Sequence, residues 1–397
     1  MNIGRHLDLW AVAATNLMRW RGRTIAIAVP LIVVMAVAAA MTFVKDGCQR
    51  DAELSASMLP DVTVQQLLAG RVDRINLSTA DRIRRMPHVA KVVPRIWGYI
   101  PLRVEARDLA YTVLGIDAGE MPFERDVALA VEKGRFLRPG DTGKAVIGKA
   151  FAHANSAGVG DRIRLRSPLG RDTEFVVVGV FSSPVQIYTA DLMLVSLRDA
   201  REFFGYLDGE ASDLCVYVDD QAHADSVAHA IAKRAPSLRV LSRDALRDLV
   251  AQAYGGRSGV FQILWLVLLV TVMLLAWAQS SSISLQMRKE IGVLKAIGWG
   301  TADVVEVKML EIAIIGLGAT LAGIALGFIY LLAGAPGIKQ YFLGWAVVYP
   351  EFPLPVYVST QSIGLLVAIG VFPLLGATVV PSWLAAIVEP DEAIRSA

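Results

Sequence analysis

The feature that this sequence most lacks is charge. Only 19% of its 397 residues are Asp, Glu, Lys or Arg, whereas about a quarter are charged in a typical soluble protein. Two long stretches, 24–44 and 258–287, contain no charged residue at all. Because 54% of the chain is hydrophobic, a wholly soluble protein is excluded. The net charge of +2 gives no indication of nucleic-acid binding.

Residue types that bind metals are also scarce. The two cysteines form no CxxC pair, and cysteine and histidine occur at no spacing typical of a zinc site. The spacing of His223 and His229 does not place them on one helical face, and His88 and His153 lie far from both in sequence. We therefore expect no metal site, and the sequence predicts no catalytic or cofactor-binding residue.

One stretch resembles a nucleotide-binding loop without meeting its requirements. Residues 140–144 read GDTGK, but a Walker A loop is G-x-x-x-x-G-K-[ST]. Arg138 stands where the first glycine is needed, and Ala145 stands where Ser or Thr is needed. The segment is predicted to be a turn, so the chain has no ATPase site of its own.

The uncharged run 24–44 predicts the first membrane span. At about 1.5 Å per residue it covers about 30 Å, the thickness of the hydrocarbon layer. The alternative is a cleaved signal peptide, but the run is long for one and no clear cleavage site follows. Arg19, Arg21 and Arg23 precede it, so the positive-inside rule puts the N-terminus in the cytoplasm. Residues 6–20 predict an amphipathic helix on the inner leaflet.

The segment 45–257 is polar and, by this topology, lies outside the membrane. Its mixed helix and strand patterns predict an α+β domain large enough for two lobes. A strand, helix, strand order across 215–241 favours a ferredoxin-like lobe. Cys48 and Cys215 would share an oxidising compartment, so a disulfide between them is one hypothesis and two unrelated thiols are the other.

Three more spans are predicted in the second half of the chain. Gly316, Gly323 and Gly327 form a small-residue face that permits close helix packing in the third span. Glu311, near the cytoplasmic start of that span, is a functional candidate because carboxylates are rare in membranes. We favour a structural role, because Lys308 is one turn away and the helix N-terminus is positive.

The stretch 284–304 (SLQMRKEIGVLKAIGWGTADV) carries most of the charge between these spans. Ile291, Leu294 and Ile297 form an apolar stripe at helical spacing, and two glycines bracket Trp299 as at a helix end. This pattern predicts a short amphipathic helix at the membrane surface. The alternative is a positively charged loop that only fixes topology.

Three motifs together resemble one family. The run RKEIGVLKAIGWG is similar to the coupling segment, REIGxLRAxG, of FtsX/MacB-type ABC transporter permeases. The pieces GRFLRPGD, AVIGKAFA, VGDRIRL and FVVVGVF resemble the MacB-like periplasmic core domain. The tail from Pro381 to Arg395 resembles the family ending P-x-x-x-A-A-x-x-x-P-x-E-A-x-R.

The resemblance implies a membrane protein with four transmembrane α-helices and a large two-lobed α+β periplasmic domain between helices 1 and 2. The expected segments are a cytoplasmic N-terminal helix 1–23, span 24–44, periplasmic domain 45–257, span 258–283, coupling segment 284–304, span 305–333, periplasmic loop 334–360, span 361–383 and cytoplasmic tail 384–397. It implies a location in the cytoplasmic (inner) membrane with both termini in the cytoplasm.

The resemblance also implies a non-catalytic subunit that works with partners. These are an ABC ATPase chain, which binds ATP and Mg²⁺, a second permease subunit in a homo- or heterodimer, and an adaptor or outer-membrane protein. The residues implied to dock on the ATPase are Arg288, Glu290, Ile291, Gly292, Leu294, Lys295, Ala296, Ile297, Gly298 and Trp299.

Two functions follow from the resemblance. The first is ATP-driven export or extraction of a lipoprotein, peptide, glycolipid or macrolide-like cargo. The alternative is a mechanotransmitting regulator that activates a periplasmic partner such as a cell-wall hydrolase.

Overall fold

The computed structural model describes residues 3–57, 59–104, 107–120, 130–183, 189, 191–281, 295, 298–335 and 354–387. The chain divides into a helical unit, made of Met1–Gly47, Gly255–Ala335 and Val356–Ala397, and a second unit made mainly of Cys48–Tyr254. Each unit is described by itself.

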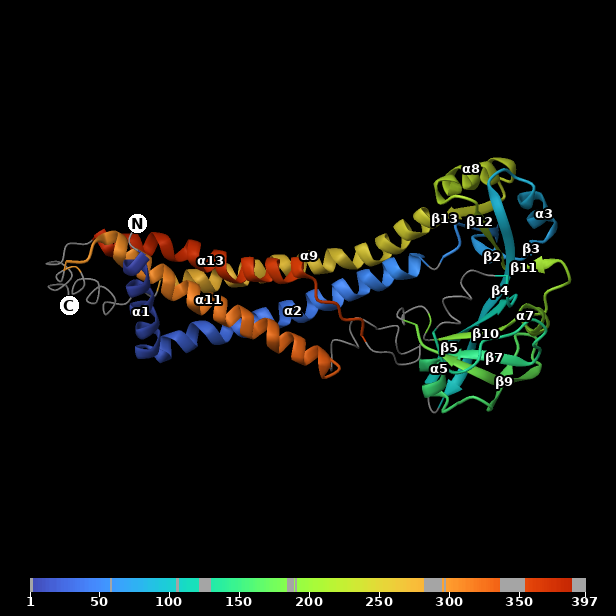
Figure 1. Ribbon diagram of the computed structural model, residues 1–397, viewed down its shortest axis with the longest axis horizontal. Helices are drawn as coiled ribbons and strands as arrows, with labels where there is room; N and C mark the ends of the chain where they lie inside the picture. Colours follow the sequence, from blue (N-terminus) through green and yellow to red (C-terminus); the bar gives the residue numbers. More distant parts are fainter. Residues whose placement is uncertain are drawn as a thin grey trace. The chain divides into compact units, whose positions relative to one another are not determined.

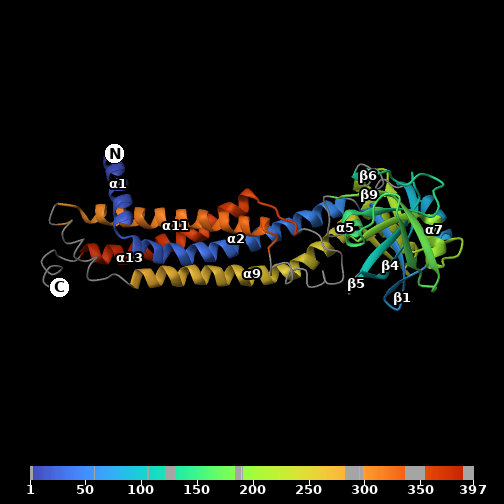
Figure 2. The same ribbon diagram turned by 90° about the horizontal axis from the view of Figure 1, so that it is seen from below.

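The described part of the helical unit contains one short amphipathic helix and four long ones (Figure 1). Their bounds are α1 Ile3–Arg19, α2 Arg21–Ser57, α9 Arg243–Ser281, α11 Thr301–Leu332 and α13 Thr360–Ile387. The membrane parts of the long helices run alongside one another in both views (Figures 1 and 2). Each expected span overlaps one of these four helices.

Three of the described helices are long and apolar enough to cross a membrane: Arg21–Asp51, Thr301–Leu332 and Thr360–Val379. The fourth, α9, has a shorter apolar stretch, Trp265–Ala278. On α2, apolar side chains four residues apart are exposed; they are Ile25, Val29, Val33 and Val37. Such a stripe fits contact with lipid or with another membrane helix.

Small residues let α11 approach its neighbours closely. A Cβ atom added at Gly327 would lie 2.5 Å from the carbonyl oxygen of Ala36 on α2, and one at Gly323 would lie 2.7 Å from Met35 Cβ. Gly316 lies against α13, where an added Cβ would be 3.4 Å from Leu374 Cδ1. The absence of side chains at these positions brings the helix backbones together, which strengthens packing where no hydrophobic effect operates.

The first and last strands of the second unit belong to the same four-stranded antiparallel arrangement. Its strand order is β13-β1-β12-β4. The elements are β1 Val62–Leu68, α3 Ser78–Arg84, β4 Val89–Val104, β12 Asp213–Val218, α8 Ala224–Arg234 and β13 Leu238–Ser242. In chain order the four strands are β1, β4, β12 and β13. Their spatial order, β13-β1-β12-β4, is therefore fourth, first, third, second. This is a ferredoxin-like arrangement, as the strand, helix, strand pattern predicted.

The remaining strands continue this sheet from β4 in the order β5-β10-β7-β9-β6, with β8 paired to β9 and β2 paired to β1. Their bounds are β2 Arg71–Asp73, β5 Arg107–Ile116, β6 Val131–Gly134, β7 Lys144–Gly148, β8 Arg162–Arg166, β9 Asp172–Phe181 and β10 Leu192–Ser196. The short strands β3 Ile75–Asn76 and β11 Glu210–Ala211 pair separately. Three short helices complete the described part: α5 Lys149–Ala154, α7 Leu197–Phe204 and the 3₁₀ helix Gln221–His223.

The strand β4 serves both parts of this sheet, pairing with β12 along its first half and with β5 along its second. Apolar strand and helix side chains form one buried cluster that includes Ile96, Tyr111 and Phe151. Asp213 is fully buried but is neutralised by Arg95, whose Nη2 lies 2.8 Å from Asp213 Oδ2. A buried carboxylate needs such a partner, because desolvation of an isolated charge is very costly.

The segment that resembles a nucleotide loop is a turn closed by its own carboxylate. Asp141 accepts a hydrogen bond from the backbone N–H of Arg138 and lies 2.7 Å from Arg135 Nη1 and 2.6 Å from Lys144 Nζ. The hydrogen bond from Arg135 is the largest cause that holds the pKa of Asp141 well below its ordinary value. The side chain of Lys144 is therefore bonded within the turn.

The hypothesis of a disulfide between Cys48 and Cys215 is contradicted by the structure, in which both residues are described and no disulfide joins them. Cys215 is fully buried in β12, where it pairs with Thr63 of β1 on one side and Val93 of β4 on the other. Burial raises the pKa of its thiol to about 12. Its side chain contributes to an apolar cluster with Val93 and Ile116, so it acts as a small core residue.

Candidate functional site

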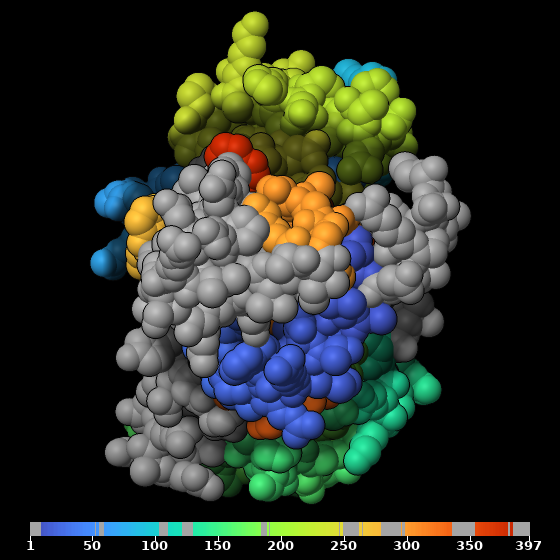
Figure 3. Space-filling view, turned by 90° about the vertical axis from the view of Figure 1, so that its left-hand side faces the viewer, coloured from blue at the N-terminus to red at the C-terminus, as the bar shows by residue number. Residues whose placement is uncertain are grey.

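The N-terminal helix α1 packs on the first turns of α11, and both are visible side by side in Figure 3, α1 in blue and α11 in orange. Leu9 and Ala13 of α1 are buried against Val307 of α11. Both are apolar residues of the amphipathic helix that the sequence predicts over 6–20. The amphipathic helix therefore covers the base of the third expected span, and its apolar face is directed at protein.

Trp299 joins the end of the predicted coupling segment to this contact. Its side chain packs against the cluster formed by Leu9, Ala13 and Val307. Gly298, just before it, has a φ of +100°, and its N–H donates to the carbonyl of Lys295. A left-handed glycine of this kind is typical of a helix end, as the two flanking glycines predicted.

Most of the residues that the resemblance implies to dock on the ATPase lie outside the described part of the chain. Arg288, Glu290, Ile291, Gly292, Leu294, Ala296 and Ile297 lie outside the described residues. Lys295 is helical, and Gly300 is the N-cap of α11, with its N–H donating to Asp303 Oδ2 at 3.2 Å. The coupling segment thus leads directly into α11 through a defined turn.

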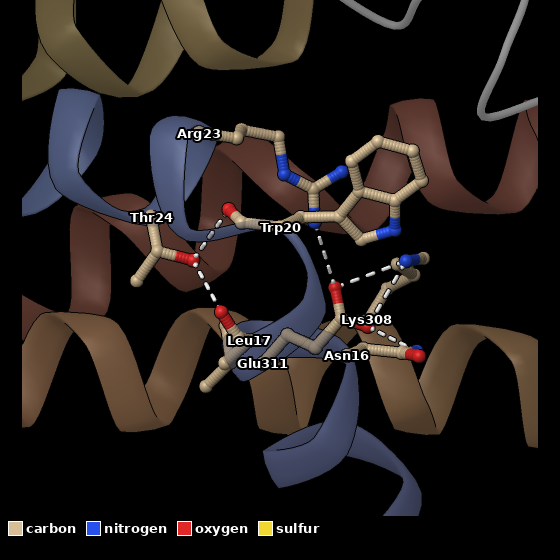
Figure 4. A network of polar contacts seen from close by, with 7 residues as sticks. All are labelled: Asn16, Leu17, Trp20, Arg23, Thr24, Lys308 and Glu311. Atoms are coloured by element: carbon tan, nitrogen blue, oxygen red, sulfur yellow. Dashed lines mark hydrogen bonds and ion pairs between the residues drawn. The ribbon is translucent and has the colours of Figure 1, made fainter.

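Glu311 is the polar centre of this contact (Figure 4). It is only 2% exposed and accepts hydrogen bonds from three side chains. Asn16 Nδ2 of α1 lies 2.9 Å from Oε1, Arg23 Nη2 of α2 lies 3.1 Å from Oε2, and Lys308 Nζ of α11 lies 3.0 and 2.9 Å from the two oxygens. One carboxylate therefore holds three helices together.

The corner between α1 and α2 is held by local hydrogen bonds. Thr24 Oγ1 donates to the carbonyl oxygens of Leu17 and Trp20, at 3.3 and 3.2 Å (Figure 4). Arg21 Nε donates to the carbonyl of Met18 at 3.2 Å. These bonds fix the direction in which α2 leaves α1, and so place Arg23 where it reaches Glu311.

A second polar contact joins the opposite end of α2 to α13. Asp46 Oδ2 accepts hydrogen bonds from Ser359 Oγ at 3.0 Å and from Ser362 Oγ. The N–H of Tyr357 donates to the carbonyl of Phe43 at 3.1 Å. A carboxylate at the start of α13 is also favoured by the positive end of that helix. The first and fourth expected spans are therefore fastened together beside this end of α2.

Sequence reasoning identified Glu311 and Lys308, because they are one turn apart on one helix. It missed Asn16 and Arg23 as partners of Glu311, since they lie 295 and 288 positions away. It also missed a cluster in the second unit. Although they are far apart in sequence, His88 and His223 both contact Asp219, so these two histidines are not scattered in the folded chain.

Comparison with known families agrees with this architecture. Residues 24–234 match the MacB-like periplasmic core domain, and residues 261–390 match the FtsX-like permease C-terminal domain. The chain belongs to the FtsX/MacB-type family of ABC transporter permeases. It is accordingly a membrane permease with a MacB-like α+β periplasmic domain, and the family implies an ATPase partner.

Curated relatives are distant and only partly aligned. An ABC transporter permease of Methanocaldococcus jannaschii, MJ1507, is 25% identical over 265 residues, which cover 63% of each chain. The lipoprotein-releasing system transmembrane protein LolC of Neisseria meningitidis is 25% identical over 268 residues, 63% of this chain and 64% of LolC. This chain thus aligns with less than two thirds of either relative.

Solved structures resemble parts of the chain. The periplasmic region of MacB from Actinobacillus actinomycetemcomitans is 13% identical and aligns over 48% of this chain and 92% of that one, with a TM-score of 0.36. The extracellular domain of the transporter YknZ from Gram-positive bacteria is 16% identical over 46% of this chain and 99% of that one, with a TM-score of 0.35.

Proposed function

We propose that this permease converts ATP hydrolysis by a separate ATPase chain into movement of its periplasmic domain. The observation that carries the proposal is the joint contact of α1, Trp299 and the start of α11, where Glu311 of α11 is bonded to Asn16 of α1 and Arg23 of α2. A displacement of the coupling segment would be passed through Trp299 to this contact. It would then reach α2 through Arg23.

The contact around Glu311 is connected to the periplasmic domain through helices that continue from one unit into the other. Two of the points at which the chain passes between the helical unit and the second unit lie within α2 and α9. Close packing of Gly323 and Gly327 on α2 would couple a movement of α11 to α2. A force applied at the coupling segment is therefore transmitted along packed helices.

The remaining parts of the proposal extend the family assignment. We propose four spans, with α9 as the second, both termini in the cytoplasm of a cell with an inner membrane, and a dimer of permease subunits. The chain itself is non-catalytic, and ATP and Mg²⁺ are bound by the partner. The similarity to a lipoprotein-releasing system protein supports a lipidated or otherwise amphipathic cargo that is extracted from the outer leaflet.

The test begins with purification of the tagged permease in mild detergent. We expect a P-loop ATPase to co-purify at about one chain per permease. In the reconstituted complex, Trp299→Ala removes the side chain that packs on α1 and α11 and should reduce the permease-dependent part of the ATPase activity. Trp10→Ala is the matched control, because Trp10 lies on α1 but is 51% exposed, and we expect no change.

Two results would count against the proposal. If no ATPase is recovered under conditions that preserve other membrane complexes, the assignment to an ATP-driven machine fails. If the ATPase binds but Trp299→Ala couples as well as the wild type, the ATPase partnership stands and the route through α1 and α11 is wrong.

A further inference from the structure

The periplasmic core domain contains a cluster of three side chains that could ligate a metal: His88, Asp219 and His223. They come from three different segments of the ferredoxin-like arrangement. His88 immediately precedes β4, Asp219 follows β12, and His223 ends the 3₁₀ helix that leads into α8. All three are partly exposed, with side-chain exposures of 47%, 53% and 39%, so an ion can reach them from solution.

The three side chains lie close enough together to share one ion. His88 Nδ1 lies 3.1 Å from Asp219 Oδ2, and His223 Nδ1 lies 3.3 Å from Asp219 Oδ1. One ligand atom from each residue lies within 4.8 Å of the others. A tetrahedral Zn²⁺ ion with bonds of about 2.0–2.1 Å separates its ligand atoms by about 3.3 Å. The separation of His88 Nδ1 from Asp219 Oδ2, 3.1 Å, is already close to this value.

The ring orientation brings both imidazoles to the same carboxylate. The rings of His88 and His223 are stacked, with centroids 3.8 Å apart and an interplanar angle of 22°. The Nδ1 atom of His88 contacts Oδ2 of Asp219, and the Nδ1 atom of His223 contacts Oδ1. Because an ionised carboxylate only accepts hydrogen bonds, each Nδ1 carries the proton in this arrangement.

The chemical state of the cluster suits a divalent cation. An aspartate is ionised at neutral pH, because the ordinary pKa of its carboxyl group is about 3.9. A cation would replace the two Nδ1 protons as the partner of the carboxylate. Each neutral imidazole would then carry its proton on Nε2, so ligation requires a change of tautomer and no oxidant or reductant.

The backbone holds the three ligands in place. His88 has a φ of +62°, which few non-glycine residues adopt, and its carbonyl accepts the N–H of Asp219 at 3.1 Å. The N–H of His223 donates to the carbonyl of Asp220 at 2.9 Å. The two stacked rings would have to rotate for both Nδ1 lone pairs to converge on one ion.

We propose that His88, Asp219 and His223 form a binding site for a divalent transition-metal ion of the Zn²⁺ class. Two imidazoles and one carboxylate suit Zn²⁺ and leave a fourth position for water or for a group from another molecule. The ion would fasten the start of β4 to the end of β12 and to the segment before α8. It would stiffen this edge of the domain whether or not an ATPase drives the protein.

The experiment measures Zn²⁺ binding to the full-length protein in detergent, purified with a tag that contains no histidine. Competition with a chromophoric zinc chelator should show one site per chain. Loss of a residue that only hydrogen-bonds to a metal ligand weakens metal affinity about 10- to 100-fold. Loss of the ligand itself in His223→Ala should weaken Zn²⁺ affinity by at least this factor. His88→Asn is the second variant, since Asn tolerates a positive φ and keeps the backbone intact.

His229→Ala is the matched control. His229 is an exposed histidine on α8 whose Nδ1 contacts the carbonyl of Asp225 instead of the cluster, so its loss should leave binding unchanged. Substitution with Co²⁺ gives an independent readout, because its visible absorption distinguishes four-coordinate binding and should vanish in His223→Ala. The proposal is overturned if the wild type shows no stoichiometric site. It is also overturned if His88→Asn and His223→Ala bind as tightly as the wild type.

Discussion

The Glu311 contact gives the sharpest prediction for stability. Replacing Glu311 with Gln keeps the shape of the side chain but leaves Lys308, only 7% exposed, without its counter-ion. Removal of one partner of a buried ion pair costs about 3–5 kcal/mol, because the remaining charge stays desolvated. We therefore expect Glu311→Gln to lower the free energy of unfolding by about 3 kcal/mol.

The same geometry predicts how this cost divides between the partners of Glu311. Arg23 is 34% exposed and remains partly hydrated, so Arg23→Gln should cost only about 1 kcal/mol. Lys308→Met combined with Glu311→Gln removes both buried charges, and most of the loss should then be recovered. The expected coupling energy between Glu311 and Lys308 in this double-mutant cycle is about 2 kcal/mol.

The assay is reversible unfolding of the full chain in mixed detergent micelles, followed by circular dichroism. Glu306→Gln, a partly buried glutamate on the same helix, is the control and should cost less than about 1 kcal/mol. The reasoning is refuted if Glu311→Gln and the double variant with Lys308→Met are equally unstable. In that case the loss would come from the hydrogen bonds to Asn16 and Arg23 and not from an unpaired lysine.

Two further predictions concern helix packing and the turn at Asp141. Gly327→Val should disrupt the contact of α11 with α2 and lower the free energy of unfolding by about 2 kcal/mol or more. Gly318→Val is the control and should be nearly neutral, because no atom lies within 4 Å of a Cβ added there. Equal melting temperatures for the two variants would contradict this packing. Asp141→Asn should destabilise the protein at pH 7 by about 1–3 kcal/mol, with fully exposed Asp208→Asn as the neutral control. The native pKa of Asp141 lies below its unfolded value, so this stabilisation is complete above the ordinary carboxyl pKa of about 3.9 and is lost as the pH falls through the native pKa. Thermal melts at pH 7 and in strong acid should therefore show the variant and the wild type converging only in acid.

Local sequence patterns were enough to predict features that depend only on residues close together in the chain, such as helices, apolar faces and turns. Uncharged runs of sufficient length located the long helices, because membrane insertion depends mainly on a continuous apolar segment. Helical periodicity located the apolar face of α1, and the flanking glycines located the turn at Trp299. The coupling and tail motifs, with the pieces of the periplasmic domain, were enough to identify the family.

The tertiary structure decided which distant residues meet. The strand β1 lies between β12 and β13, and this non-local pairing buries Cys215, which forms no disulfide with Cys48. Packing of α1 on α11 gives Glu311 its long-range partners, and the end of β12 brings Asp219 to His88 across 131 positions of sequence. Side-chain spacing along one chain could not reveal these contacts, because they depend on how the strands and helices are arranged in space. The sequence alone thus determined the kind of protein, and the fold decided where its charges are neutralised and where a metal ion can bind.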